Sequence, residues 1–499
     1  MSLATIHSRA CLGIDAPAVQ VEVHLANGMP SLTLVGLPET AVRESKDRVR
    51  SALLNAQLEF PGSKRITISL APADLPKDGG RFDLAIALGL LAASGQIPAQ
   101  ALTDCECIGE LALSGELRPI QGVLPVALAC RDAGRKLILP AANEAALVSG
   151  IELIAADHLL PLCAHLRGEQ RLPDLPPTAP SEPARHADLA DVQGQEQAKR
   201  ALIIAASGGH NLLLFGPPGT GKTLLASRLP GILPPLAEQE ALEVAAIQSV
   251  CDRTPLSAWP ARPFRSPHHG ASAAALVGGG SQPRPGEISQ AHHGVLFLDE
   301  LPEFDRKVLE MLREPLESGA IHIARAREQL RFPARFQLVA AMNPCPCGYQ
   351  GDPSSRCRCT PEQVQRYRSK LSGPLLDRID LHLAMRNEPF SLQGNNEPGR
   401  PDSATAAAQV AAARARQLNR QQGLNAHMGL ESLRTHCKLS DADAQWLEQA
   451  VTRLGLSHRA SHRVLKVART LADLDAVAQI SRSHLAEALQ YRQLDRQPG

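Results

Sequence analysis

The stretch that decides the fold reads Gly216-Pro217-Pro218-Gly219-Thr220-Gly221-Lys222-Thr223. It follows the apolar residues 211–215 and opens a helical pattern, and this strand, turn and helix start are the context of a phosphate-binding loop. In such a loop the backbone N–H groups and the helix N-terminus face a polyphosphate. The pattern predicts that Lys222 contacts the β- and γ-phosphates and that Thr223 binds Mg²⁺. A chance glycine turn lacks this context, so the sequence predicts a site for a nucleoside triphosphate such as ATP.

Length and composition limit the remaining possibilities. The chain has 499 residues, enough for about three domains. Its formal net charge is +1, so any site for a polyanion must be local. It contains no apolar run of about 18 residues and does not begin with a signal-peptide pattern. The eleven cysteines are too sparse for a disulfide scaffold, and we expect a cytoplasmic protein with reduced thiols.

The first 166 residues alternate strand and helix patterns. Two segments within them are distinctive, namely LPKDGGR at residues 75–81 and GELALSGELRPIQG at residues 109–122. Both resemble segments of the proteolytic domain of Lon. The resemblance implies a Lon-protease-like (S5 domain 2-like) α/β domain over residues 1–166.

The residues that would carry Lon-type peptidase chemistry are missing. Arg81 stands where the resemblance places the nucleophilic serine, and Leu124 and Val126 stand where it places lysines. A Ser–Lys dyad needs a hydroxyl and an amine in contact, and these three side chains supply neither. We therefore expect the fold without the peptidase, with a role in assembly or partner docking.

A proline-rich segment, residues 167–187, reads as an exposed linker. The segment DLADVQGQ that follows it, residues 188–195, resembles the part of AAA+ proteins that packs beside adenine. The resemblance implies nucleotide contacts for Val192, Gly194 and Gln195, and an AAA+ α/β core over residues 188–386.

Two further apolar runs end in polar residues. Residues 295–298 lead into Asp299 and Glu300, and a buried parallel strand presents such an end to the ligand crevice. We expect Asp299 to hold Mg²⁺ and Glu300 to polarise the attacking water, although the pattern also fits a strand that ends in solvent. Residues 336–342 end at Asn343, which resembles the AAA+ sensor 1; an asparagine that begins a turn before proline is the alternative.

The segment GPLLDRIDL, residues 373–381, resembles the AAA+ box whose arginine acts on the ATP of a neighbouring subunit. It implies that Arg378 is an arginine finger in trans within a homo-hexamer; a surface pair with Asp377 or Asp380 is the alternative. Residues 387–403 read as a hinge loop.

Residues 404–499 read as a helical lid. Within it, residues 456–463 resemble sensor 2, which implies a nucleotide contact for Arg459, with Arg463 as the rival and a solvent-facing arginine as the alternative.

An expected helix over residues 304–317 is followed by an expected hairpin over residues 321–332. Together with the insertion at residues 268–280, this hairpin resembles the pore loops of the pre-sensor-1 insertion clade, which includes MCM helicases and magnesium-chelatase motors. Arg325 and Arg327 are predicted to bind DNA; the alternative is a solvated hairpin whose arginines pair with Glu328.

The longest distinctive stretches are FRSPHHGAS, PRPGEISQAHHGVLFLDELPEF, NPCPCGY and LSGPLLDRIDL. They resemble the ComM/YifB group of magnesium-chelatase-like AAA+ proteins. The resemblance implies a hexameric helicase that drives branch migration of recombining DNA in natural transformation, with single-stranded or branched DNA as its partner. A MoxR-like chaperone that remodels a protein, or an ATP switch without motor activity, is the alternative.

Four cysteines form two C-x-C pairs, which suit one tetrahedral Zn²⁺. They are Cys345, Cys347, Cys357 and Cys359, and four reduced thiols without metal are the alternative. Two pairs of adjacent histidines, at 268–269 and 292–293, are expected to pack or to form loop hydrogen bonds rather than to bind metal.

Overall fold

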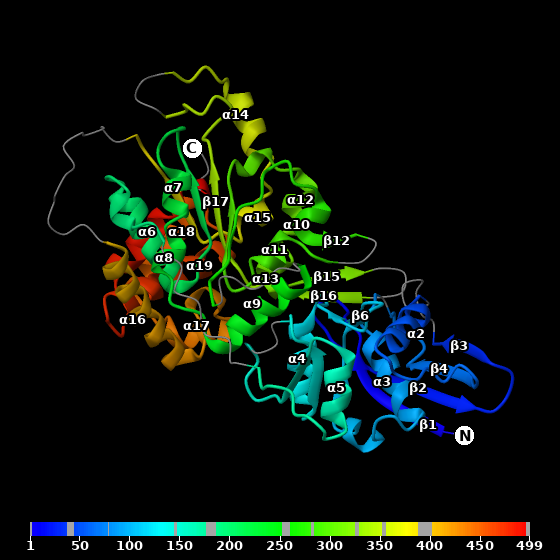
Figure 1. Cartoon of the computed structure of the whole chain (residues 1–499). Helices are drawn as coiled ribbons and strands as arrows, with labels where there is room; N and C mark the ends of the chain where they lie inside the picture. The colour runs from blue at the N-terminus through cyan, green and yellow to red at the C-terminus, as the bar shows by residue number, and fades with distance from the viewer. Residues whose placement is uncertain are drawn as a thin grey trace. The chain divides into compact units, whose positions relative to one another are not determined.

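The computed structural model describes residues 2–36, 44–77, 79–143, 147–175, 186–251, 260–280, 284–324, 329–351, 356–387 and 402–495. The chain forms two compact units (Figure 1). The first contains Met1–Glu182 and Glu238–Pro260, and the second contains Pro183–Ala237 and Ala261–Gly499. Residues 176–185 of the predicted linker and residues 388–401, most of the predicted hinge, lie outside the described residues.

A seven-stranded sheet, in the order β3-β4-β2-β1-β5-β8-β9, forms the centre of the first unit. β2 pairs antiparallel with β1 and β4, and the other neighbours pair parallel. β2 and β3 follow each other in sequence but do not pair, because β4 lies between them. The strands are β1 Ser2–Arg9, β2 Ala18–Ala26, β3 Ser31–Val35, β4 Arg65–Ala71, β5 Cys105–Cys107, β8 Lys136–Pro140 and β9 Leu153–Ala156.

Helices and a small hairpin complete this unit. Helix α3 is buried along nearly its whole length, as its almost uniformly apolar sequence requires. The helices are α2 Ser45–Asn55, α3 Asp83–Ala93, α4 Val123–Asp132, α5 Leu159–Leu166 and α9 Glu238–Cys251, and the hairpin pairs β6 Glu110–Leu111 with β7 Leu117–Arg118.

At the positions where the Lon-like pattern would place peptidase residues, the first unit has side chains with structural contacts. A guanidinium nitrogen of Arg81 donates to the carbonyl of Gln121 at 3.0 Å, so the two Lon-like segments do meet. Leu124 and Val126 are buried in the apolar core. The structure thus places a buried cation and two core side chains at these positions, and the likeness of the whole domain to Lon stays a prediction.

Helix α9 folds with the first unit although its residues lie within the predicted AAA+ range. The N–H of Gly122 donates to the carbonyl of Ser249 at 2.8 Å. Leu242 and Ala245 of α9 join the same apolar cluster as Val126. Burial of this apolar face explains why a helix that follows the nucleotide loop in sequence belongs to the other unit.

The second unit is built on a parallel sheet in the order β11-β14-β17-β10-β18. The strands are β10 Leu212–Phe215, β11 Phe264–Arg265, β14 Val295–Leu298, β17 Gln337–Met342 and β18 Leu381–Ala384. The three central strands are buried and apolar, as the sequence predicted for parallel strands. Because all strands run the same way, their carboxyl ends share one edge.

The expected helix over residues 304–317 is in fact two short helices, α12 Arg306–Met311 and α13 Pro315–Ser318. Pro315 begins the second helix, and proline is tolerated at a first turn but not in a helix interior. The predicted hairpin follows, with β15 Ala320–Ala324 antiparallel to β16 Gln329–Pro333. Residues 325–328, which include Arg325 and Arg327, lie outside the described part of the chain.

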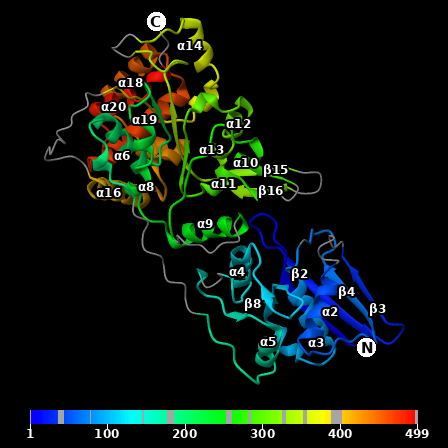
Figure 2. The same cartoon turned by 45° about the horizontal axis from the view of Figure 1, so that its top comes forward.

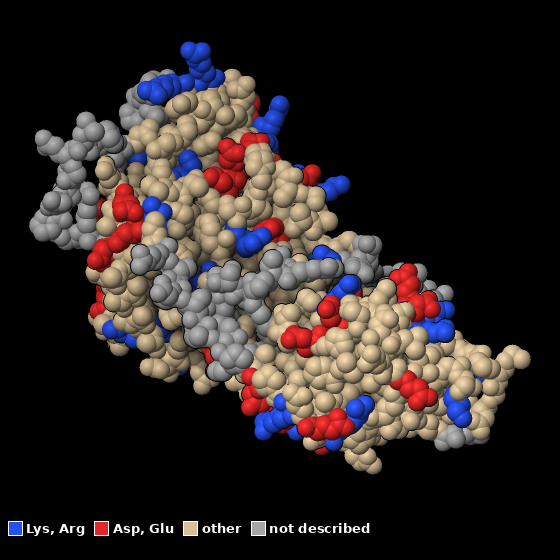
Figure 3. Space-filling view, in the orientation of Figure 1, with Lys and Arg blue, Asp and Glu red and all other residues tan. Residues whose placement is uncertain are grey.

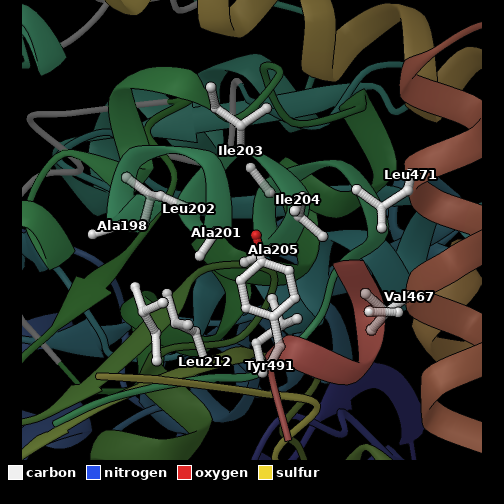
Figure 4. Packing of buried hydrophobic residues seen from close by; sticks show 14 of the residues in the cluster. Ala198, Ala201, Leu202, Ile203, Ile204, Ala205, Leu212, Val467, Leu471 and Tyr491 are labelled. Atoms are coloured by element: carbon white, nitrogen blue, oxygen red, sulfur yellow. The ribbon is translucent and has the colours of Figure 1, made fainter. Parts of the chain in front are cut away.

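The carboxyl-terminal helices gather beside α6, Glu196–Gly208 (Figure 2). Val467 and Leu471 of α19 lie near side chains of α6 and β10 in the shared core (Figure 4). The helices are α16 Ser403–Gln421, α17 Leu430–His436, α18 Asp441–Leu454, α19 His458–Leu474 and α20 Arg482–Gln490. In the described ranges, none of the helices combines the length and the apolar character that a membrane crossing needs.

Buried charge also holds these helices together. The carboxylate of Asp473, 1% exposed, accepts from Arg420 at 2.7 and 2.9 Å. It also accepts from Arg469 at 3.2 Å and from Asn425 at 2.8 Å. One carboxylate on α19 therefore balances two arginines from two helices.

Asp473→Ala should lower the free energy of unfolding by about 3–5 kcal/mol, because it leaves the buried Arg469 and the partly buried Arg420 without their counter-charge. Urea unfolding followed by circular dichroism measures this. Asp443→Ala is the matched control, since its 3.0 Å pair with Arg482 lies at the surface and should contribute about 0–1 kcal/mol. Equal losses in the two variants would contradict the structural role of Asp473.

Candidate nucleotide site

The glycine-rich loop joins β10 to α7, Lys222–Ala226. Gly219 and Gly221 have φ values of +81° and +83°, a backbone region that favours glycine. The Lys222 ammonium donates to the carbonyls of Gly216 at 2.7 Å and Pro217 at 2.9 Å. Burial lowers the pKa of Lys222, while the charge of Asp299 acts in the opposite direction. The loop therefore holds its lysine against its own backbone, where a phosphate oxygen would be the better partner.

The predicted Mg²⁺ ligands are in contact. The Thr223 hydroxyl donates to a carboxylate oxygen of Asp299 at 2.6 Å. Asp299 directly follows β14, and Thr223 lies in the first turn of α7. A hydroxyl oxygen next to a carboxylate oxygen suits Mg²⁺, because this ion takes oxygen ligands and retains several waters.

Glu300 occupies an unusual backbone position beside this pair. Its φ is +51°, and its N–H donates to Asp299 at 2.9 Å. Its carboxylate is about half exposed, and one oxygen lies 3.2 Å from Nδ1 of His269. Sequence reasoning expected packing or loop hydrogen bonds for this histidine pair and did not identify Glu300 as a partner, since nothing in the local pattern signals a residue 31 positions away.

Asn343 completes the edge of the sheet. It follows β17, and its side-chain oxygen lies 3.3 Å from the Lys222 ammonium. The loop that follows Asn343 packs against the glycine-rich loop at Gly348. The approach is so close that a Cβ atom added to Gly348 (φ +83°) would lie 2.9 Å from Pro218. The predicted sensor residue is thus in contact with the predicted phosphate-binding lysine.

Four sulfur atoms gather in the same loop region. The Sγ atoms of Cys345, Cys347, Cys357 and Cys359 all lie within 4.8 Å of one another. The Cys345–Cys347, Cys345–Cys357 and Cys347–Cys357 distances are 3.4, 3.8 and 3.7 Å. Sulfurs around a tetrahedral zinc with bonds of about 2.3 Å are about 3.8 Å apart, whereas a disulfide bond is about 2.05 Å. The spacing therefore fits a metal tetrahedron.

The turn at residues 192–195 lies next to the end of β18. Val192 is buried, and Gly194 and Gln195 have φ values of +58° and +56°. The Gln195 amide donates to the carbonyl of Arg386 at 2.7 Å. Met385, the residue before Arg386, lies directly against the glycine-rich loop. A Cβ atom added to Gly216 would be only 2.3 Å from the Met385 carbonyl oxygen. The turn is therefore linked to the phosphate-binding loop through this segment.

The predicted arginine finger and the preferred sensor 2 arginine share one carboxylate. Arg378 is 6% exposed, and its guanidinium lies 2.6 Å from an oxygen of Glu317. Arg459 from α19 pairs with the same oxygen. The partner of Arg378 in this chain is thus Glu317 of α13, rather than the Asp377 or Asp380 considered from sequence.

Arg463, the rival for the sensor 2 role, pairs with Asp380. Asp380 lies directly before β18 and is buried. Burial by itself would raise the pKa of Asp380, but the charge of Arg463 and a hydrogen bond from His210 hold it well below its usual range. The two lid arginines therefore contact two different carboxylates of the core.

Comparison with known proteins covers nearly the whole chain. The family of magnesium chelatase subunit ChlI matches residues 188–392, its C-terminal family matches residues 400–492, and a further ChlI family matches residues 21–143. The protein YifB of Salmonella typhimurium is 54% identical over 500 residues, covering 99% of this chain and 98% of its own length. Competence protein ComM of Haemophilus influenzae is 52% identical over 506 residues, with the same coverage. The chain belongs to the ComM/YifB group of magnesium-chelatase-like AAA+ proteins.

More distant relatives match a smaller part of the chain. The magnesium-chelatase 38 kDa subunit of Cereibacter sphaeroides is 29% identical over 171 residues, which is 31% of this chain and 51% of that protein. Membership of the ComM/YifB group therefore rests on the full-length relatives, YifB and ComM.

Lys222→Ala should abolish ATP binding, whereas Glu300→Gln should bind ATP and release phosphate at least about 100-fold more slowly, since a lost general base costs 10²–10⁴-fold. A fluorescent ATP analogue measures binding, and a coupled assay measures phosphate release. Lys370→Ala is the control, because this lysine is half exposed and pairs with Glu303 at 3.2 Å. Wild-type turnover by Glu300→Gln would show that another group activates the water.

Proposed function

We propose that this ComM/YifB-group protein is an ATPase that forms a homo-hexameric ring and drives branch migration of DNA. ATP and Mg²⁺ would occupy the site of Lys222, Thr223 and Asp299, with Glu300 activating water and Asn343 orienting it. The contacts of Thr223 with Asp299 and of Lys222 with Asn343 support this, because they join four predicted site residues from three separate segments. The full-length similarity to a competence protein supports DNA as the substrate.

In the proposed ring, Arg378 acts on the ATP of the neighbouring subunit. Within one chain this arginine binds Glu317, so ring assembly must replace that carboxylate with a phosphate. The lid arginine Arg459 would make the corresponding exchange on the nucleotide of its own subunit. For the first unit we propose assembly or partner docking.

The β15–β16 hairpin is the proposed DNA contact. Ile321 and Phe332 are buried on one face, while His322 and Arg331 form an exposed cross-strand pair on the other. On the face of the molecule seen in Figure 3, basic and acidic side chains are interspersed. With a net charge of +1, phosphate contacts must be concentrated, and a ring would gather Arg325 and Arg327 from every subunit.

A protein-remodelling AAA+ chaperone is the second candidate. The magnesium-chelatase families that match the chain support it. A remodeller grips side chains with apolar or aromatic loop residues, whereas the sequence of this hairpin carries arginines. ATPase stimulation by branched DNA therefore distinguishes the two functions.

Arg325→Ala, alone or with Arg327→Ala, should weaken DNA binding and lower DNA-stimulated ATP turnover and junction migration. Each lost phosphate contact should make the slope of log K against log salt shallower by about 0.7 on single strands. Fluorescence anisotropy at several salt concentrations measures the slope, with the exposed Arg453→Ala as control. An unchanged slope would remove the hairpin from the DNA site, and a wild type that ignores DNA would favour the chaperone.

We also propose that the four cysteines hold a structural Zn²⁺. None of the eleven cysteines, all of which lie in the described ranges, forms a disulfide bond. Free thiols suit the reducing cytoplasm, where we place the protein. Metal-binding energy is local folding energy, so zinc would order the loop that rests on Pro218.

Elemental analysis of freshly purified, reduced protein should find one zinc per chain, and Cys357→Ser should lose it while Cys251→Ser retains it. Because the loop contacts the phosphate-binding loop, zinc loss should also weaken ATP binding. Protein without zinc but with full ATP affinity would show that the cysteines are only thiols.

A further inference from the structure

A cavity of about 550 Å³ lies among the carboxyl-terminal helices, away from the residues of the nucleotide site. Side chains of α16, α17, α18 and α19 line it, together with residues 478–481 before α20. Sites for small molecules have volumes of about 300–1,000 Å³, so the cavity is large enough for a ligand. Because four helices and a connecting segment form its walls, the cavity depends on the folded lid.

Cationic side chains predominate in the lining of this cavity. Arg420 of α16, Arg469 of α19 and Lys438, three residues before α18, all line it. Asp443 is the only carboxylate among the described lining residues. Its charge is already engaged, because it accepts from Arg482 at 3.0 Å. The lining is therefore cationic overall.

The buried carboxylate of Asp473 reduces this charge only in part. It is shared by Arg420 and Arg469, so it balances one of the two arginines. Together with the pair of Arg482 and Asp443, four cations then face two carboxylates. Burial and the positive charges of Arg420 and Arg469 also lower the pKa of His436, which lines the same cavity. The field in the cavity therefore favours a ligand with two negative charges.

The two arginines are held in place by contacts within the lid. Arg420 bonds to both oxygens of Asp473, at 2.7 and 2.9 Å. Arg469 donates to the carbonyls of Val477 and Ala478 at 2.6 Å each, and Ala478 forms part of the cavity wall. A guanidinium has five N–H groups, so each arginine has a further N–H to offer a ligand. Donors that are already fixed lose little conformational entropy when a ligand binds.

Lys438 supplies an ammonium group that is available for binding. Its side chain is exposed, and it makes no hydrogen bond or ion pair with any residue that the structure describes. Leu439 and Ile480 add apolar surface to the same cavity. An available ammonium group, two fixed guanidinium groups and an apolar wall suit a charged phosphate group that is attached to a small organic part.

We propose that this cavity is a binding site for a phosphate monoester. Such a group carries about −1.5 to −2 charges at pH 7 and has three strong acceptor oxygens. Both properties match the excess of positive charge and the donors from three parts of the lid. Two sources offer the same group, namely a free small molecule and the 5′-phosphate at the end of a DNA strand. The inference does not depend on the roles proposed for the nucleotide site.

Isothermal calorimetry on the full chain, saturated with ADP and Mg²⁺ so that the glycine-rich loop is occupied, tests this site. Inorganic phosphate and glycerol 3-phosphate are the probes. Lys438→Ala should weaken their binding at least about tenfold, the effect of one lost charge-assisted bond. Arg434→Ala is the matched control, because this exposed cation lies on α17 but does not line the cavity. An unchanged melting temperature identifies folded variants.

Two oligonucleotides that differ only in a 5′-phosphate identify the source of the ester. If Lys438→Ala weakens binding of glycerol 3-phosphate, the cavity takes a free ester. If it weakens only binding of the phosphorylated oligonucleotide, the cavity takes the end of a DNA strand. The proposal is wrong if the wild type binds none of these probes, or if Lys438→Ala binds all of them as tightly as Arg434→Ala does.

Discussion

Parallel pairing of β17 with both β10 and β14 is the constraint on which the nucleotide site depends. The register places Phe215 opposite Met342 and Leu298 opposite Ala340. The residues that follow the three strands therefore emerge at one edge of the sheet. A slip of one residue would turn every side chain of a strand to its other face and move these polar residues away from each other. Buried apolar strands on both sides make that slip costly, so core packing fixes the geometry of the site.

The lid is attached by charge as well as by apolar packing. Asp473 balances two arginines within the lid, and Asp380 joins the lid to the start of β18 through Arg463. Buried ion pairs contribute little net stability, because desolvation offsets much of their attraction. Their geometry is restrictive, however, since a displaced lid would leave buried charges unpaired. Such contacts favour a few defined lid positions over a continuous range.

Much of the site was predictable because its signals are local. The glycine-rich loop, the strand before Asp299 and the strand before Asn343 each follow from a short run of residues and its expected strand direction. Even the break at Pro315 was visible in the sequence, although the helix pattern around it suggested one continuous element.

The features that sequence reasoning missed depend on partners far apart in the chain. Packing of α9 with the first unit, the contact of His269 with Glu300 and the contact of Arg378 with Glu317 are of this kind. Hydrophobic periodicity shows that a helix has an apolar face, but it does not identify the surface that covers this face. A charged residue likewise shows that it needs a partner without showing which partner it meets.

The residues for binding and for hydrolysis are supported by different parts of the structure. Thr223 and Asp299, the proposed Mg²⁺ ligands, lie at a helix start and a strand end and bond directly to each other. Glu300 and Asn343, which would act on water, are contacted by loops, the first by His269 and the second by the segment that contains the cysteines. Regular elements hold their ends more rigidly than loops, which have fewer backbone hydrogen bonds. Substitutions in the loop beside Glu300 should therefore act mainly on the rate of hydrolysis, whereas substitutions in the sheet, or in the cysteine loop that lies against Pro218, should also act on nucleotide affinity. In such an arrangement the proposed Mg²⁺ ligands stay in place while the rate of hydrolysis responds to movement of the loop beside Glu300.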